Sequence, residues 1–324
     1  MQQKTTTLRT QFEQEVYDGL TTFPKYLSSK YFYDVIGDKL FQDIMAMPEY
    51  YLTDCEFDIL QKHKQAIGNV FYADQKAFSM FELGAGDGKK TKILLQHFLD
   101  SKIEFDYRPI DISQNALDQL ASAISKELPA VTINTLQGTY FDTLADIGSD
   151  TTRKKVILFL GSNIGNLLHL QAIDFLKQLR AVINSDDLIF MGFDQKKNPQ
   201  TILDAYNDKT GITEAFNKNI LTRINTELGG NFDLDKFLHW EVYDPETGTA
   251  KSYLVSKELQ KVSIEALELQ LEFRPWETIH TEISQKYNDE VVQWLANEAG
   301  LTVHAQFSDD EDYYKNYIFK KDIR

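Results

Sequence analysis

Apolar and polar residues follow helical and strand periods along most of this 324-residue chain. Between residues 55 and 194, segments with apolar residues at helical spacing alternate with short apolar runs. The run KKVILFLGS (154–162) is apolar on both faces, as in a central parallel strand. The other predicted strands are AFSMFELG (77–84), FDYRPIDIS (105–113), AVTINTLQG (130–138) and DDLIFMGFD (186–194). Five strands separated by helices predict an α/β fold with a doubly wound parallel sheet.

This alternation stops after Asp194 and returns near the C-terminus. The residue pattern of 199–228 predicts helix. That of 237–264 predicts antiparallel strands joined by a turn at DPETG. A predicted helix at 287–300 and two strands after it resume the α/β pattern. Residues 196–285 are therefore a predicted insertion, and we expect the segment before about residue 60 to pack beside it. Two lobes would leave a cleft between them, which is a common site for a small ligand.

A glycine-rich turn, FELGAGDGKKT (81–91), follows the first strand of the predicted sheet. It lacks the spacing of the phosphate loop GxxxxGK[ST], because only three residues separate Gly84 from Gly88. Lys89 stands where the dinucleotide motif GxGxxG requires its third glycine. What remains is E-x-G-x-G with an acid, Asp111, at the end of the next strand, where a carboxylate can bind ribose hydroxyls. This arrangement resembles the first two motifs of class I S-adenosylmethionine-dependent methyltransferases; a turn that binds no ligand is the alternative.

Composition excludes several partners. The formal net charge of -15 argues against nucleic acid and anionic membranes, which need clustered Lys and Arg. Cys55 is the single cysteine, so no intrachain disulfide is possible and a cytoplasmic location is expected. No apolar run approaches the ~20 residues of a membrane-spanning helix. The histidines lack metal-ligand spacing, so we expect no metal.

Further segments extend the resemblance from about residue 25 to the C-terminus. They are YFYDVIGDKLFQDIMAMPEYYLTDCEFDIL (31–60), LFLGSNIGNL (158–167), DAYNDKTGITEAFNKNIL (204–221), ELGGNFDLDKF (227–237) and TEISQKY (281–287). Together they resemble the histidine-specific Nα-methyltransferases of ergothioneine biosynthesis. The resemblance implies S-adenosylmethionine as the methyl donor, L-histidine as the small-molecule acceptor, and the trimethylated product hercynine. It also implies a monomer with two domains.

The implied domains follow the predicted elements. Residues 61–195 and 286–324 would form a class I methyltransferase core with a Rossmann-like, doubly wound sheet. Residues 1–60 and 196–285 would form an inserted α+β substrate-binding domain.

The resemblance assigns the cofactor-binding residues position by position. They are Gly84, Gly86, Lys90, Asp111, Thr139, Tyr140 and Gly161. In the family an acidic residue commonly stands at the position of Thr139, so this chain departs from the pattern where adenine would be contacted.

The resemblance also implies an acceptor site. Asn166 would hold the α-amino group, Tyr33 and Tyr206 would bind the amino-acid backbone, and Tyr33 and Asn166 would be the catalytic pair. Phe41 and Tyr50 would line the pocket, Ser252 stands where the family often has methionine, and Glu282 and Ser284 would face the imidazole.

The chemistry of amine methylation suits these residue types. The sulfur of the donor leaves neutral, so no general acid is needed and positioning supplies much of the acceleration. The amine must arrive without its proton, and the amide of Asn166 can accept an N–H without favouring the charged form. On a strand, Glu282 and Ser284 project from the same face and can bind both ring nitrogens of an imidazole.

Other interpretations remain open from the sequence alone. Glu282 and Ser284 could lie on an exposed strand face, and Asn166 could cap the helix that follows it. The acceptor could be another amino acid, such as tryptophan or tyrosine. The chain could also be a non-catalytic module that binds S-adenosylmethionine.

Overall fold

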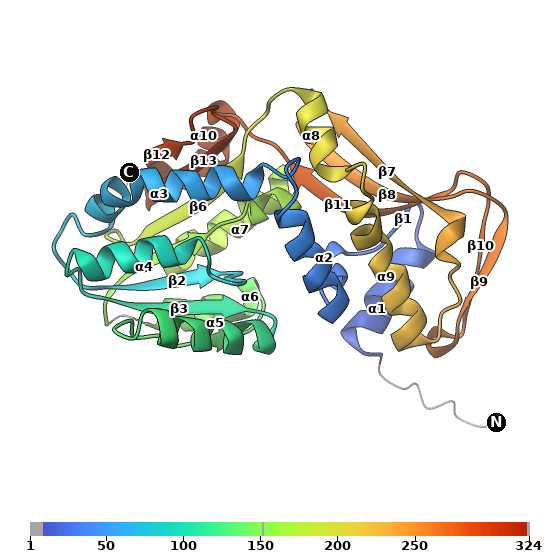
Figure 1. Ribbon diagram of the computed structural model, residues 1–324, viewed down its shortest axis with the longest axis horizontal. Helices are drawn as coiled ribbons and strands as arrows, with labels where there is room; N and C mark the ends of the chain where they lie inside the picture. Colours follow the sequence, from blue (N-terminus) through green and yellow to red (C-terminus); the bar gives the residue numbers. More distant parts are fainter. Residues whose placement is uncertain (1–8, 151, 323–324) are drawn as a thin grey trace. The chain divides into compact units, whose positions relative to one another are not determined.

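The computed structural model describes residues 9–150 and 152–322, and the chain divides into two compact units (Figure 1). We call residues 52–196 and 285–324 the core unit, and residues 1–51 and 197–284 the insertion unit. The sequence placed the first boundary after residue 60. It lies before residue 52 instead, because α3 (Leu52–Phe71) is one continuous helix whose buried face packs in the core unit.

The core unit contains a seven-stranded sheet. In spatial order its strands are β12 (Leu301–Ser308), β13 (Tyr314–Lys321), β6 (Leu188–Asp194), β5 (Lys154–Phe159), β2 (Phe78–Leu83), β3 (Phe105–Asp111) and β4 (Leu136–Gln137). Strands β2 to β6 pair in parallel, whereas β13 is antiparallel to both β6 and β12. The order reverses at β2, so the carboxyl ends of β2 and β5 border the switch point where doubly wound sheets bind ligands.

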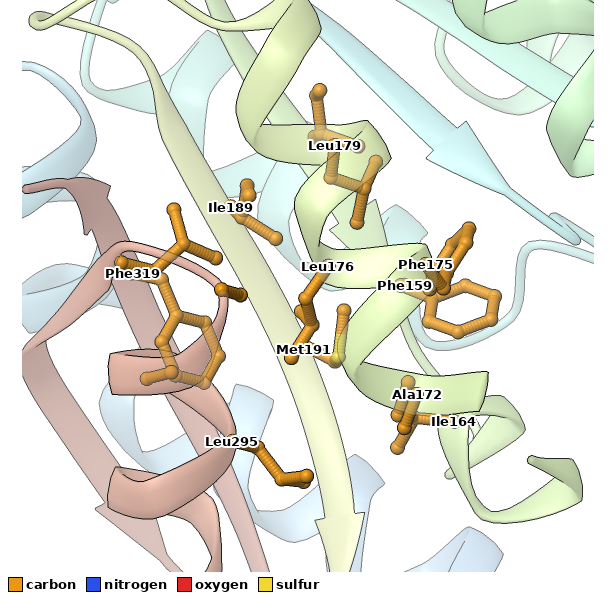
Figure 2. Packing of buried hydrophobic residues seen from close by; sticks show 14 of the residues in the cluster. Phe159, Ile164, Ala172, Phe175, Leu176, Leu179, Ile189, Met191, Leu295 and Phe319 are labelled. Atoms are coloured by element: carbon orange, nitrogen blue, oxygen red, sulfur yellow. The ribbon is translucent and has the colours of Figure 1, made fainter. Parts of the chain in front are cut away.

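Helices cover both faces of this sheet (Figure 1). One face packs against α3, α4 (Thr91–Asp100) and α5 (Gln114–Glu127). The other packs against α6 (Tyr140–Ser149), α7 (His169–Val182) and α10 (Asp289–Glu298). Figure 2 shows this second layer, where Leu176 and Phe175 of α7 lie over β6 and its neighbours. Burial on both faces is why β5 and β6 each contain a long apolar run.

The predicted doubly wound sheet is confirmed, with differences at its edge. The segment AVTINTLQG forms only the two-residue strand β4 and one isolated bridge, between Tyr107 and Ile133. As an edge segment it has a partner on one side only, so its β character is not matched by a full ladder. Helix α6 has no counterpart among the predicted elements.

The insertion unit is built on a four-stranded sheet. Its strands, in spatial order, are β1 (Lys25–Tyr26), β11 (Thr278–Gln285), β8 (Thr249–Ser256) and β7 (Phe237–Asp244). β1 pairs in parallel with β11, so the N-terminal segment joins the sheet of the insertion. The hairpin of β9 (Gln260–Ile264) and β10 (Leu269–Phe273) stands apart from it.

Helices complete the insertion unit. They are α1 (Gln11–Thr21), η1 (Ser29–Phe32), α2 (Val35–Met45), α8 (Pro199–Tyr206), α9 (Ile212–Leu228) and the short η3 (Leu234–Lys236) and η4 (Glu265–Leu267). The segment predicted as helix over 199–228 breaks into α8 and α9, because Asp208 accepts hydrogen bonds from the backbone N–H groups of Ile212 and Thr213. The left-handed Gly211 then begins α9.

Candidate active site

The glycine turn after β2 has the backbone conformation that its composition predicts. Gly84, Gly86 and Gly88 have φ angles of 73°, 53° and 63°, in the left-handed region that favours glycine. A Cβ atom on Gly84 would lie 2.7 Å from the hydroxyl oxygen of Tyr140. A Cβ atom on Gly86 would meet no heavy atom within 4 Å, so the space above this residue is open.

Asp111 is attached to this turn. One carboxylate oxygen accepts a hydrogen bond from the N–H of Gly86 at 3.2 Å, and the other accepts one from the N–H of Ser113 at 3.0 Å. Burial, and secondarily the charge of Asp111, raise the pKa of Tyr140 well above its usual range. The structure therefore brings Gly84, Gly86, Asp111 and Tyr140 together at one edge of the sheet. A carboxylate has about four lone-pair sites, so Asp111 has acceptors left for ribose hydroxyls.

Lys90 and Gly161 share a partner that the sequence analysis missed. The ammonium of Lys90 lies 2.5 Å from a carboxylate oxygen of Glu56, and the N–H of Gly161 donates to the same oxygen at 2.7 Å. Glu56 is fully buried on α3. Its position in line with Leu52, Ile59 and Leu60 on the apolar face of α3 is the signal that could have marked it.

Thr139 has a structural role at the expected adenine position. It is the N-cap of α6: its hydroxyl accepts from the N–H of Asp142 at 3.2 Å and donates to the Asp142 carboxylate at 2.6 Å. A contact between Thr139 and adenine stays a prediction.

Glu82, the acid of the first motif, lies fully inside the core unit. The hydroxyl of Thr91 donates to one of its oxygens at 2.6 Å, and the hydroxyl of Tyr107 donates to the other. Burial raises the pKa of the Glu82 carboxyl to about 7. Glu82 thus joins β2, β3 and the first turn of α4, which fixes the glycine turn between them.

Asn166 ends the short helix η2 (Asn163–Asn166) after β5, and it is exposed. The N-cap of α7 is Leu168, so Asn166 does not cap that helix. Hydrogen bonds hold the loop that carries Asn166. The hydroxyl of Tyr287 donates to the carbonyl of Ile164 at 3.1 Å. The hydroxyl of Ser162 accepts from the N–H of Asp194 at 3.1 Å.

In the insertion unit, four predicted acceptor residues form a continuous series of aromatic contacts. The ring of Tyr33 lies 5.5 Å from that of Phe41, Phe41 lies 6.4 Å from Tyr50, and Tyr50 lies 6.1 Å from Tyr206, all edge to face. Edge-to-face pairs of this kind are typical of packed aromatic clusters. Phe216 of α9 contacts both Tyr33 and Phe41 and fixes the first pair.

This series ends at the strand that carries the predicted imidazole-binding residues. The hydroxyl oxygens of Tyr206 and Ser284 are 2.7 Å apart. His239 supports Tyr206 from β7: its Nδ1 accepts from the amide of Asn217 at 2.7 Å, so its Nε2 donates to the carbonyl of Tyr206 at 2.9 Å. Glu282 is half-buried two residues before Ser284.

Ser252 also has a polar partner within the insertion unit. It is buried opposite Glu241 in the β7–β8 ladder, and its hydroxyl donates to the Glu241 carboxylate at 2.7 Å. Glu241, also buried, was not predicted. A serine paired with a carboxylate makes this part of the unit polar where the family often has methionine.

Residues 9–150 and 152–322 contain no group of three or more His, Cys, Asp or Glu side chains placed to hold a metal ion. Within the same ranges no helix has the length and hydropathy needed to cross a membrane.

The sheet order and the glycine turn with its acid define a class I, S-adenosylmethionine-dependent methyltransferase. Comparison with known proteins narrows this class. The family of histidine-specific, S-adenosylmethionine-dependent methyltransferases matches residues 12–321, and the chain belongs to that family. The predicted family resemblance is therefore confirmed.

Two relatives agree with this assignment by sequence. The chain is 34% identical over 287 residues to the histidine N-alpha-methyltransferase of Mycolicibacterium smegmatis, covering 89% of this chain and 88% of that protein. It is 28% identical over 303 residues to ergothioneine biosynthesis protein 1 of Schizosaccharomyces pombe, covering 91% of this chain and 39% of that protein. Among solved structures, the CcbJ methyltransferase of Streptomyces caelestis is similar with a TM-score of 0.45 and 14% identity, over 81% of this chain and 95% of that one.

Proposed function

We propose that this protein transfers methyl groups from S-adenosylmethionine to the α-amino group of L-histidine, giving the trimethylated product hercynine. The observation that carries the proposal is the match of the histidine-specific family to residues 12–321. The gathering of Tyr33, Phe41, Tyr50, Tyr206 and Ser284 in one series of contacts supports it, because these are the residues that the family resemblance assigns to the acceptor.

The donor would bind at the carboxyl edge of the core-unit sheet. Bound there, S-adenosylmethionine supplies an activated methyl group on a sulfonium. The residues present fit its nucleoside: the backbone is open above Gly86, and the carboxylate of Asp111, fixed by two backbone donors, faces the same turn. Asp111 would accept the ribose hydroxyls, Tyr140 would lie near the glycine turn, and Lys90 would supply positive charge for the donor's carboxylate.

The acceptor residues would orient the amine rather than activate it chemically. Asn166 can accept an amine N–H through its amide oxygen, and the hydroxyls of Tyr33 and Tyr206 can bind the amino-acid backbone. A neutral amide and neutral hydroxyls do not stabilise the ammonium form as a carboxylate would, so they permit the deprotonated amine that methylation needs. Positioning of this kind is the main source of rate acceleration in such a transfer.

Recognition of the side chain would rest on Glu282 and Ser284. The carboxylate can accept from one imidazole nitrogen, and the Ser284 hydroxyl can donate to or accept from the other. The Tyr206 hydroxyl shares a hydrogen bond with Ser284, so the groups for the backbone and for the ring are linked. An indole has one N–H and a phenol one O–H, so neither presents polar atoms at two ring positions to pair with both Glu282 and Ser284, and an unpaired polar group costs free energy.

The direct test is methylation of an amino-acid panel. Purified protein, S-adenosylmethionine and each of histidine, tryptophan, tyrosine and the other common amino acids are incubated, and the mass gain of each amino acid is followed. We expect histidine to gain up to three methyl groups and the others none. Turnover of tryptophan or tyrosine without histidine would contradict the proposal, and so would donor binding by calorimetry with no turnover of any amine.

A further inference from the structure

A buried carboxylate in the core unit connects the two loops that border the proposed donor site. Glu56, on the first turns of α3, has no exposed surface. One of its oxygens accepts from the Lys90 ammonium at 2.5 Å and from the Gly161 N–H at 2.7 Å. Lys90 lies in the turn after β2, and Gly161 in the turn after β5, so one oxygen atom joins both turns.

The second oxygen of Glu56 is hydrogen-bonded to side chains of the core-unit sheet. It accepts from the hydroxyl of Tyr314 at 3.1 Å and from the amide of Asn316 at 2.9 Å, both on β13. Room for this carboxylate depends on Gly192 of β6, where a Cβ atom would lie 2.3 Å from a Glu56 oxygen. Two donors of β13 and the space left by Gly192 therefore hold one Glu56 oxygen on the sheet side, and the other oxygen accepts from the two turns.

Packing alone does not require a charged side chain at position 56. Burying a carboxylate is costly unless a cation and hydrogen bonds compensate it, and an apolar pair in the same place is often as stable. The compensating cation is Lys90, whose side chain retains 21% exposure while Glu56 has none. A Cβ atom on Gly161 would be 3.6 Å from the Lys90 ammonium, so the backbone of the second turn lies against that charge.

We infer that Glu56 is a positioning residue for the methyl donor: it holds the Lys90 ammonium and the Gly161 turn in one fixed arrangement, so that the donor meets a preformed site. The inference rests on the donor site proposed above and concerns donor binding, before any acceptor is present. Without Glu56, Lys90 would adopt many conformations, and the turn after β5 would lose the acceptor of its N–H. The donor would then have to order both on binding, which lowers its affinity.

Binding of S-adenosylhomocysteine by calorimetry tests the inference without turnover. Glu56→Gln keeps the side-chain shape but removes the charge, and we expect it to weaken S-adenosylhomocysteine binding by about tenfold to a hundredfold, the range for a lost charge-assisted hydrogen bond. Lys90→Gln should weaken it by a similar factor. The double variant should be no weaker than the worse single variant by more than a few-fold, because the two side chains act as one pair.

Asn316→Leu is the matched control. It removes a hydrogen bond to the same carboxylate from the sheet side, at a residue of β13 and not of either turn. We expect it to lower the melting temperature and to change the affinity for S-adenosylhomocysteine by less than threefold. In Glu56→Gln the Michaelis constant for S-adenosylmethionine should rise, with that for histidine unchanged.

A purely structural role would give a different pattern. If Glu56→Gln lowers the melting temperature as Asn316→Leu does but binds S-adenosylhomocysteine like the wild type, the inference is overturned. If Glu56→Gln does not fold, Glu56→Asp decides: it keeps the charge but is one methylene too short to reach both turns, and wild-type affinity in this variant would equally overturn the inference. Wild-type protein that binds S-adenosylhomocysteine but methylates no histidine would instead refute the proposed function and leave this inference standing.

Discussion

The hydroxyls of Tyr206 and Ser284 lie 2.7 Å apart, although the two residues are 78 positions apart in the sequence. Tyr206 ends α8 and Ser284 lies near the end of β11, so the contact joins a helix and a strand of the insertion unit. The residue assigned to the amino-acid backbone thereby touches a residue assigned to the ring. Substitutions at either residue should therefore weaken the binding of histidine more than the binding of the methyl donor.

The Tyr206 hydroxyl is tested by Tyr206→Phe. Loss of a hydrogen bond in a buried site costs about 1–1.5 kcal/mol. We expect the Michaelis constant for histidine to rise roughly tenfold, with an unchanged dissociation constant for S-adenosylhomocysteine. The control is Tyr26→Phe, because Tyr26 lies on β1 of the same unit and is exposed. It should change neither the Michaelis constant for histidine nor the dissociation constant for S-adenosylhomocysteine. A rise in both constants in Tyr206→Phe would argue against a specific role at the acceptor.

Glu282→Ala should weaken histidine binding by about tenfold to a hundredfold, because its carboxylate is proposed to meet only the imidazole. Calorimetry with histidine and, separately, with S-adenosylhomocysteine checks this. Glu272→Ala removes an exposed carboxylate from β10 of the same unit and is the matched control. Equal losses for both ligands in Glu282→Ala would indicate a folding defect instead of a lost ring contact.

Gly86 and Gly211 form a matched pair for the donor turn. Both have positive φ, at 53° and 80°, and a Cβ atom on either would meet nothing within 4 Å. Alanine at either position costs about 1–2 kcal/mol of backbone strain. We expect only Gly86→Ala to weaken S-adenosylhomocysteine binding, at least tenfold, since the added methyl group enters the space proposed for the donor. Equal affinity in the two variants would show that the donor does not approach Gly86.

His239 should make stability depend on pH. Burial lowers the pKa of His239 below its usual value of 6.5, so the folded protein binds this proton less readily than the unfolded chain. The free energy of unfolding should therefore be highest above about pH 6.5 and fall as the pH decreases through that value. His239→Gln should lose this part of the pH dependence in urea titrations, and His63→Gln should retain it. A wild-type slope in His239→Gln would show that other groups cause it.

Glu82 should make stability depend on pH with the opposite sign, so that its contribution is lost as the pH rises. Burial raises the pKa of its carboxyl from 4.5 to about 7, so the folded protein holds a proton that the unfolded chain has already lost. This contribution is present below about pH 4.5 and is lost as the pH rises to 7, a difference of about 3 kcal/mol. Glu82→Gln should abolish it, so the stability of the variant relative to the wild type should rise with pH over this interval. Glu127→Gln, an exposed carboxyl on α5, should show no such change.

Local chemistry made the donor side predictable. Gly84, Gly86 and Asp111 lie at the ends of two successive strands, and the carboxyl ends of adjacent parallel strands meet at one edge. Spacing and residue type were therefore enough to predict their proximity. The acceptor residues were found only through the family resemblance, because one tyrosine among 16 carries no positional signal of its own.

The sequence by itself determined the α/β alternation, the insertion, the glycine turn and the family, because each is written in periodicity or in a contiguous motif. Tertiary structure alone decided the pairings of distant side chains that neither a motif nor the family resemblance indicated. The carboxylate of Glu56 meets Asn316 across 260 positions, and Ser252 meets the unpredicted Glu241 through the strand register. The tertiary structure also places the first boundary between the units at the start of α3, not after residue 60. Such pairings depend on how whole elements pack, and local residue patterns do not encode that packing.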